Sequence, residues 1–261
     1  MAHSQDTTPE LIHTLDRTLV IRARPETVFR YFTDDRRWAT WWGAGSAIDA
    51  RPGGRMLIRY PNGVEASGEV LEVAPPDRIV FTYGYASGEP IGPGASRVTI
   101  ALAPHPDGTH LTLTHAFADA AVRDPHVQGW RYQLSVFANI VSDEVMTIAA
   151  ERADAWFAAW ANPDAAAREA AFSTVARPDV EFRDRYSSVS GLSELLPHVT
   201  AAQRFMPGIL LTRQGDVRIC QGTALVDWVA TAGSESRGTG TNVFAFDADG
   251  RIANVTGFWG R

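Results

Sequence analysis

One predicted strand in the second half of the chain combines a carboxylate with apolar neighbours, the pattern that general-base chemistry requires. If residues 180–186 form a strand, the side chains of Val180, Phe182, Asp184 and Tyr186 alternate onto one face. Desolvation in an apolar cavity raises the pKa of a carboxylate and so brings a general base toward neutral pH. We therefore assign Asp184 as a candidate base, with Tyr186 as a candidate oxyanion donor, for enolisation next to a carbonyl.

A structural role for the same carboxylate is the competing interpretation. Arg183 and Arg185 flank Asp184, and an ion pair with either guanidinium would make this side chain part of a structural network. Both interpretations stay open at the level of sequence. The other side chains predicted to line this cavity are Phe182, Trp228, Asn242 and Asn254.

The first half of the chain offers a histidine on an apolar strand face. On the predicted strand 109–117, His115 shares a face with Leu111, Leu113 and Phe117. Buried polar groups are normally hydrogen-bonded, so His115 is either a core histidine with a backbone or tyrosine partner, or a group that faces a ligand. The other strand and helix side chains predicted to reach a cavity in this half are Phe81, Tyr83 and Trp130.

Three tryptophans gather in the turn-rich stretch that ends at residues 51–54. Trp38, Trp41 and Trp42 form either a lid at the mouth of the predicted cavity or a plug at a junction between helix and sheet. We count all three as candidate ligand-binding residues. Both alternatives stay open.

The composition excludes several classes of function. The chain has 261 residues and no lysine, which excludes Schiff-base chemistry, a pyridoxal phosphate anchor and a Walker-type phosphate loop. The net charge is −6 and both halves are acidic, so no nucleic-acid partner is expected. Cys220 is the single cysteine and the histidines are scattered, so we expect no disulfide, no metal site and no cofactor.

The ends of the chain and its hydropathy suggest a cytoplasmic protein. No uncharged run reaches the length of about 18 residues that a membrane span requires. The first residues lack the basic and apolar regions of a secretory signal, and residues 1–11 are predicted to be a flexible tail.

The hydrophobic pattern predicts two domains of mixed helix and strand. In the first, a short helix begins at Pro25, and strands cover 15–23, 55–60, 63–73, 78–85, 97–103 and 109–117. Residues 127–162 then show helical spacing, as one long helix or as two that meet near residues 143–146. We place the domain boundary there, which gives domains at 12–146 and 147–261.

The second domain begins with a helix. Helices are predicted at 164–176 and 193–205, and strands at 180–186, 209–231 with an internal turn, 239–247 and 251–259. Each half therefore has the composition of a curved antiparallel sheet crossed by helices, which is an α+β arrangement.

Residues 12–146 resemble a known family. The segments that carry the resemblance are Ala23–Phe29, Trp41–Gly43, Pro52–Arg55, Gly68–Val80, Asp107–Thr109 and Gly129–Trp130. Together they are similar to the START-related helix-grip superfamily (SRPBCC), in the branch named for the activator of the heat-shock-protein-90 ATPase. This resemblance implies a seven-stranded sheet wrapped around a long C-terminal helix, with a cavity between them.

Residues 148–261 resemble a second family. The segments that carry this resemblance are Trp156–Trp160, Val180–Asp184, Gly191–Leu192, Arg237–Val243 and Phe246–Ile252, together with Phe258. They are similar to the nuclear transport factor 2-like superfamily, nearest its SnoaL-like polyketide cyclase branch. The resemblance implies a cone-shaped α+β barrel with a pocket at its open end. Many relatives carry a carboxylate where this chain has Asn242, so an acid–base role does not carry over to that position.

The function expected from these patterns is the binding of a small, largely apolar molecule in one or both cavities. One alternative is a cyclase or isomerase that uses Asp184 as its base. Another is an interaction module, either a partner of chaperones or a homodimer that pairs through the C-terminal domain. The sequence does not identify the ligand.

Overall fold

The computed structural model describes residues 10–260, so most of the predicted tail at 1–11 lies outside the described residues. The chain divides into two compact units, one up to Val141 and one from Ser142 onward. Each unit contains one sheet. Among the described residues, no helix is long and apolar enough to cross a membrane.

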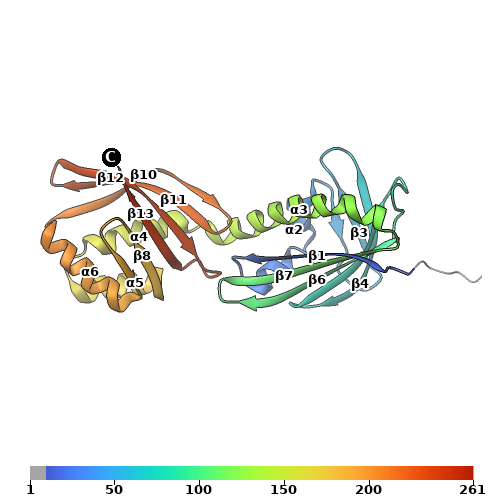
Figure 1. Cartoon of the computed structure of the whole chain (residues 1–261), viewed down its shortest axis with the longest axis horizontal. Coiled ribbons are helices and arrows are strands. Elements are labelled where there is room, and N and C mark those ends of the chain that lie inside the picture. Colours follow the sequence, from blue (N-terminus) through green and yellow to red (C-terminus); the bar gives the residue numbers. More distant parts are fainter. Residues whose placement is uncertain (1–9, 261) are drawn as a thin grey trace, which may run out of the picture. The chain divides into compact units, whose positions relative to one another are not determined.

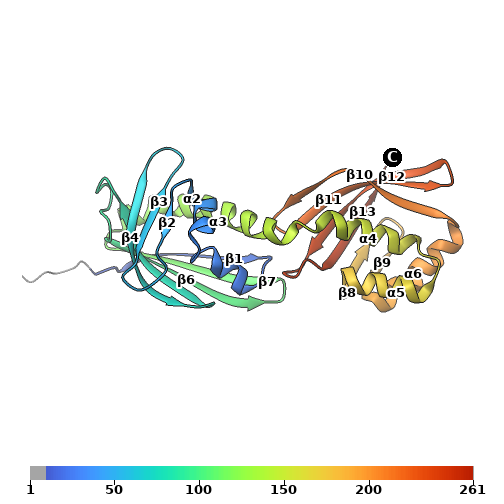
Figure 2. The same cartoon turned by 180° about the vertical axis from the view of Figure 1, so that it is seen from behind.

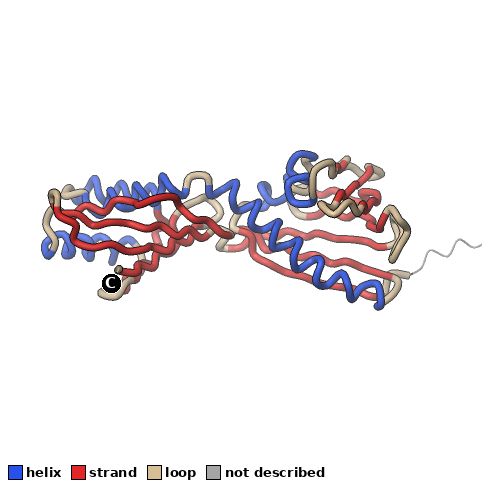
Figure 3. Tube along the Cα trace, turned by 90° about the horizontal axis from the view of Figure 1, so that it is seen from above, coloured by secondary structure: helices blue, strands red, loops and turns tan. Residues whose placement is uncertain are grey.

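The N-terminal unit is a seven-stranded antiparallel sheet with a long helix across one face (Figure 1). Seen from above, this helix, α3, runs diagonally over the strands (Figure 3). The strands follow the order β1-β7-β6-β5-β4-β3-β2. The elements are β1 (His13–Ile21), α1 (Pro25–Arg30), α2 (Asp35–Trp42), β2 (Ala47–Ile48), β3 (Arg55–Arg59), β4 (Glu65–Ala74), β5 (Arg78–Tyr85), β6 (Ser96–His105), β7 (Gly108–Phe117) and α3 (Ala120–Met146).

Helix α3 buries the apolar stripe that its sequence spacing predicts. Trp130, Leu134, Phe137 and Val141 are each at most 5% exposed. These positions lie on one face of a helix, and the burial of each large apolar side chain contributes about 1.5–3 kcal/mol to folding. Sheet and helix thus form one core in this unit.

Helix α2 replaces a stretch that the sequence pattern predicts as turns. Asp34 caps its first turn by accepting a hydrogen bond from the backbone N–H of Arg37 at 2.9 Å. Trp38, Trp41 and Trp42 follow at helical spacing and are all buried. Figure 2 shows α2 beside β2 and β3. The cap and the spacing outweigh the glycines that made the stretch look irregular.

The C-terminal unit is a six-stranded sheet in the order β10-β11-β12-β13-β8-β9. Its helices lie on one side of the strands (Figure 1). The elements are α4 (Ala149–Ala161), α5 (Ala165–Val175), β8 (Ala176–Arg183), β9 (Ser188–Ser190), α6 (Leu192–Phe205), β10 (Ile209–Cys220), β11 (Thr223–Ala232), β12 (Glu235–Phe246) and β13 (Ile252–Trp259).

The α+β class is confirmed in both units, but the expected C-terminal barrel is wrong. The sheet stays open, with β10 at one edge and the three-residue strand β9 at the other. So short a strand offers too few hydrogen bonds to close the sheet onto β10. One pair, β13 with β8, is parallel, so this sheet is mixed rather than wholly antiparallel.

The helical region consists of two helices, α3 and α4, separated at residues 147–148, which is the second of the two alternatives that the sequence left open. One further difference from the predicted elements affects the site. Strand β8 ends at Arg183, three residues earlier than predicted, because the chain turns at Asp184. The turn is held by a backbone hydrogen bond from Asp184 N–H to Ser187 O at 2.9 Å.

Candidate functional site

The aromatic residues predicted to line an N-terminal cavity pack against one another in the core. The rings of Trp41 and Trp42 have centroids 4.2 Å apart, and Trp42 approaches the ring of Trp130 at 5.7 Å. Trp38 packs on Phe81 edge to face at 5.9 Å. The backbone accepts the indole N–H of Trp38 and of Trp41, whereas that of Trp42 is buried without a partner. These contacts favour the plug over the lid.

His115 lies in the middle of this interior and uses both ring nitrogens. The indole N–H of Trp130 donates to His115 Nδ1 at 2.9 Å, so that nitrogen carries no proton. Nε2 therefore carries the proton and donates to Ser96 Oγ at 2.8 Å. The Ser96 hydroxyl in turn donates a hydrogen bond to the carbonyl oxygen of Tyr83, also at 2.8 Å. The contacts are those of a core histidine.

Burial controls the protonation of the polar groups in this interior. It lowers the pKa of His115 well below its ordinary value, with a further contribution from His126. Burial also lowers the pKa of His126, against the effect of its hydrogen bond to Val122 O. Burial raises the pKa of Tyr60 to about 12 and raises that of Tyr83 as well. At neutral pH the network is therefore uncharged.

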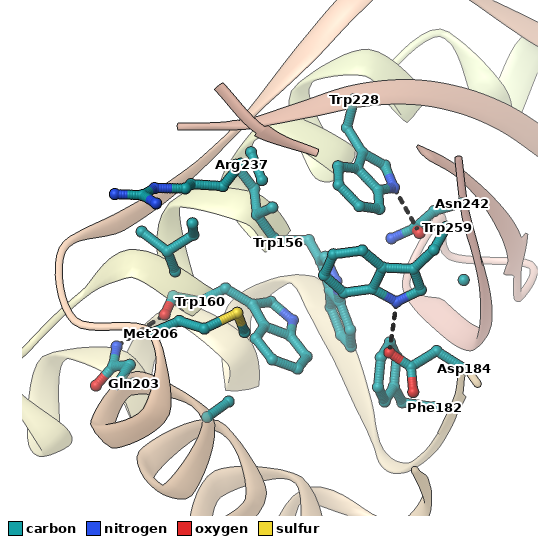
Figure 4. A pocket seen from close by; sticks show the side chains of 15 residues that line it. Trp156, Trp160, Phe182, Asp184, Gln203, Met206, Trp228, Arg237, Asn242 and Trp259 are labelled. Carbon is teal, nitrogen blue, oxygen red and sulfur yellow. Dashed lines mark hydrogen bonds between the residues drawn. The ribbon is translucent and has the colours of Figure 1, made fainter. Parts of the chain in front are cut away.

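The C-terminal unit contains a cavity of about 80 Å³ between its helices and the inner face of its sheet (Figure 4). Five aromatic side chains form most of its wall, and a few polar groups complete it. The lining residues are Trp156, Trp160, Phe182, Asp184, Ala202, Gln203, Met206, Ile209, Leu211, Trp228, Ala230, Arg237, Asn242, Gly257 and Trp259.

Alternation and helical spacing explain how these side chains converge. Trp156 and Trp160 lie one turn apart on α4 and face the sheet. Phe182 on β8 packs against Trp160, with ring centroids 5.2 Å apart. Trp228 on β11 and Trp259 on β13 meet edge to face at 5.1 Å. Helix α4 and three strands thus supply five aromatic rings that surround the cavity. We call this set the aromatic box: Trp156, Trp160, Phe182, Trp228 and Trp259.

The hydrogen bond between Asn242 and Trp228 determines which way the Asn242 amide faces. It is 6% exposed, and its Oδ1 accepts the indole N–H of Trp228 at 2.9 Å. An indole nitrogen only donates, so the atom facing it must be the amide oxygen. The amide nitrogen consequently points into the cavity, as Figure 4 shows.

Asp184 lines the cavity but also organises the turn that follows β8. Its Oδ1 accepts hydrogen bonds from the backbone N–H groups of Tyr186 and Ser187 and from the Ser187 hydroxyl, at 2.8–2.9 Å. Its Oδ2 accepts the indole N–H of Trp259 at 3.1 Å. The carboxylate is therefore a structural acceptor as well as a cavity residue.

The expected ion pair of Asp184 with its flanking arginines is wrong for the described residues. The Arg183 guanidinium instead pairs with Glu181 at 3.2 Å. The guanidinium of Arg185 lies over the ring of Tyr186, 5.0 Å from its centroid. Because both arginine side chains have these other neighbours, neither neutralises the carboxylate in the cavity wall.

Two predicted site residues lie outside the cavity. Tyr186 is 70% exposed, because β8 ends before it and the turn carries its ring onto the outside of Trp259. Asn254 is on the other face of the sheet, where its amide donates to Glu181 at 3.2 Å. A shift in the pairing of β13 between residues 252 and 254 puts Asn254 on that face.

Sequence reasoning missed several residues of the wall, and some of them had a signal. Trp156 and Trp160 are four apart in a helical segment, which is the spacing of a shared face. Trp259 continues the alternation of Val255 and Gly257 on the last strand. Gln203 has no comparable pattern, since its place depends on how α6 packs.

A buried arginine fixes Gln203 in the wall. Arg168 is 2% exposed and donates to Gln203 Oε1 at 2.9 Å, to Thr200 Oγ1 at 2.6 Å and to Asn162 O at 2.8 Å. The Gln203 amide nitrogen donates to the carbonyl oxygens of Trp160 and Asn162. These carbonyls lie at the C-terminal end of α4, where a cation is favoured.

Part of the chain, within the N-terminal unit, matches a known protein family. Residues 22–142 match the family described as activator of Hsp90 ATPase homolog 1-like protein. This match confirms the N-terminal resemblance seen in the sequence. No functionally curated protein matches the chain.

Solved structures resemble parts of the chain. One is a protein from Agrobacterium tumefaciens described as an isomerase of the SnoaL-like family. It is 21% identical over 42% of this chain and 96% of its own, with a TM-score of 0.41. The protein Mll3558 from Rhizobium loti is 30% identical over 48% of this chain and 94% of its own, with a TM-score of 0.41. The Aha1 dimer from Colwellia psychrerythraea is 16% identical over 47% and 91%, with a TM-score of 0.42.

Proposed function

We propose that the C-terminal cavity binds a small, largely apolar molecule about the size of one substituted ring. The observation that carries this proposal is the aromatic box itself, in which five rings surround an open space of about 80 Å³. An enclosed apolar cavity of about 150 Å³ binds benzene. A substituted ring in this smaller space would therefore extend into the open mouth of the cavity. The N-terminal interior is a weaker candidate for ligand binding, because its aromatic side chains pack directly against one another.

Ethylbenzene is the simplest probe of this proposal. We expect ethylbenzene to bind the full chain saturably at one site. Calorimetry and tryptophan fluorescence during a titration measure this binding. The absence of saturable binding at millimolar ethylbenzene would overturn the proposal.

A pair of variants on α6 locates the binding site. Ala202 lines the cavity, whereas its neighbour Ala201 is exposed and does not. Ala202→Leu is expected to lower the affinity for ethylbenzene about tenfold or more by occupying cavity space, and Ala201→Leu is expected to leave it unchanged. Equal effects of the two variants would place the binding elsewhere.

A cyclase or isomerase activity through Asp184 is the second candidate function. The observation that favours it is the position of Gly257, where an added Cβ would lie 3.2 Å from Asn242 Oδ1 and 3.3 Å from Asp184 Cβ. The carboxylate and the amide therefore border the same end of the cavity. A carbonyl held by Asn242 would bring its α-carbon near Asp184, the arrangement that enolisation requires.

Hydrogen exchange tests that activity directly. In deuterated water the wild-type chain is expected to speed the replacement of the methyl protons of acetophenone by deuterium, as read by NMR. Asp184→Asn should abolish the acceleration while circular dichroism stays unchanged. Exchange at the same rate in both proteins would exclude Asp184 as the base.

Pairing of two copies is a separate proposal. On the side of the C-terminal sheet away from the cavity, Leu210 and Phe258 are 52% and 56% exposed. Apolar side chains at exposed sheet positions favour an interface. Light scattering of the full chain is expected to give the mass of a dimer, and a Phe258→Glu variant that of a monomer. A monomeric wild-type chain would contradict this, and the chaperone-partner role expected from the sequence would then need its own binding assay.

A further inference from the structure

Two hydrogen-bond donors of the C-terminal cavity have no acceptor within the part of the chain that the structure describes. The first is the Asn242 amide nitrogen, which points into the cavity while Trp228 occupies the amide oxygen. The second is the indole N–H of Trp160, which is buried without a hydrogen-bond partner. In Figure 4 the Trp160 nitrogen lies on the side of its ring toward Trp156. A buried donor without an acceptor, such as the Trp160 indole N–H, costs free energy, and the Asn242 amide nitrogen adds a second unpaired donor at the cavity. The site is therefore complementary to a molecule that supplies an acceptor.

The acceptors that line the cavity already have donors. Asp184 accepts four hydrogen bonds, and the one from the Trp259 indole covers its second oxygen. The side-chain oxygen of Gln203 accepts from Arg168. A ligand donor would have to share an oxygen that already accepts a hydrogen bond, whereas a ligand with only an acceptor competes with no existing donor.

We propose that the cavity selects small aromatic carbonyl compounds, with the carbonyl oxygen accepting a hydrogen bond from the Asn242 amide nitrogen. This inference rests on the proposed function, because it names the chemical class of the molecule that the aromatic box holds. The ring occupies the space between the tryptophans, and the carbonyl oxygen faces the Asn242 amide nitrogen. Asn242 is thus a specificity residue of this cavity.

Three probes of nearly the same shape test the inference: ethylbenzene, acetophenone and α-methylbenzyl alcohol. They place a methylene, a carbonyl and a hydroxyl at the same position next to the ring. Calorimetry with the full chain is expected to show acetophenone binding about tenfold more tightly than ethylbenzene, since one unmatched buried donor gains its acceptor. The alcohol is expected to bind more weakly than acetophenone, because its hydroxyl hydrogen must share an Asp184 oxygen that already accepts a hydrogen bond.

Two matched substitutions assign the preference to a single amide. Asn242→Asp keeps an oxygen for the Trp228 indole but removes the donor that faces the cavity. It is expected to abolish the preference for acetophenone while leaving the affinity for ethylbenzene within about twofold. Asn254→Asp makes the same change on the other face of the sheet and should keep the preference. Thermal unfolding of each variant shows whether it remains folded, and Asn242→Leu, which also lacks the donor, provides a second readout.

The outcomes separate this inference from the proposed function. Equal binding of acetophenone and ethylbenzene, or a preference that survives Asn242→Asp, would overturn the carbonyl assignment and leave the apolar cavity intact. Tighter binding of the alcohol than of acetophenone would also overturn it, by showing that Asp184 accepts from the ligand. Failure of all three probes to bind would reject both the cavity proposal and the inference built on it.

Discussion

Tryptophan side chains have different roles in the two units. In the N-terminal unit, Trp130 donates its indole N–H to His115, and a chain of hydrogen bonds continues through Ser96. In the C-terminal unit, Trp160 keeps its indole N–H unpaired beside an open cavity. The comparison teaches that the number of aromatic residues does not mark a binding site. The buried Trp42 indole of the N-terminal unit also lacks a partner, so an unpaired donor marks a site only where it borders open space.

Removal of one core tryptophan from each unit should give the largest contrast. Trp38→Ala is expected to lower the free energy of unfolding of its unit by about 3–5 kcal/mol, because Trp38 is fully buried. Trp259→Ala, at the half-buried wall of the cavity, should cost less than about 2 kcal/mol in its own unit. Hydrogen–deuterium exchange of the full chain, read separately for the two units by mass spectrometry, measures both losses. Equal losses would refute the distinction between a filled interior and a site with open space.

The turn at Asp184 should give the next largest effect. Asp184→Ala removes the acceptor of four hydrogen bonds and is expected to destabilise the C-terminal unit by about 2 kcal/mol. Asp184→Asn keeps one oxygen for the turn and should cost about half as much, while its amide faces the Trp259 indole. Urea unfolding followed by tryptophan fluorescence measures both values. A neutral Asp184→Ala would show that the turn forms without the carboxylate and would favour the catalytic assignment.

Acidification should affect the N-terminal unit first. Burial lowers the folded-state pKa of His115 and of His126, so the unfolded chain takes up protons at a higher pH than the folded chain. Stability is then complete above the ordinary histidine value of about 6.5 and is lost as the pH falls through the lowered folded-state pKa. The slope is at most about 1.4 kcal/mol per pH unit for each histidine.

Urea titrations between neutral and mildly acidic pH test this slope. His115→Gln should flatten it, and His105→Gln, which changes a partly exposed histidine at the end of β6, should not. Stability that is independent of pH over this range, or a loss confined to the C-terminal unit, would contradict the assignment. Protonation also leaves the Trp130 indole facing a second donor, which is why the loss should be local.

The sequence predicted the architecture better than the site, for physical reasons that particular residues show. Period-2 alternation placed strand β5 at residues 78–85, and helical spacing placed Trp130 on the buried face of α3. Local patterns of this kind identify which face is buried, and so Phe182, Trp228 and Asn242 were assigned to the cavity.

Alternation fails where the chain leaves regular geometry. The turn after Arg183 exposed Tyr186, and the shift in the pairing of β13 moved Asn254 to the other face. Neither event has a local sequence signal as strong as the alternation it interrupts. Gln203 depends on Arg168, 35 positions earlier in the chain, and a contact of this range is not visible to any local pattern.

The smallest expected effect on stability is at Gly257. A substitution there tests whether the C-terminal cavity distinguishes its ligands through Asn242. An alanine Cβ there would lie 3.2 Å from Asn242 Oδ1 and 3.3 Å from Asp184 Cβ, so small shifts of these side chains would accommodate it. Gly257→Ala should change the free energy of unfolding by less than about 1 kcal/mol, yet its Cβ presses on the Asn242 amide, the group that the carbonyl is expected to contact. Acetophenone should therefore lose more affinity than ethylbenzene in parallel calorimetric titrations. Gly129→Ala in α3 has no neighbouring atom within 4 Å and should affect neither ligand. An equal loss for both ligands would mean that the carbonyl does not lie beside Asn242, and the functional difference between the two units would then rest on cavity volume alone.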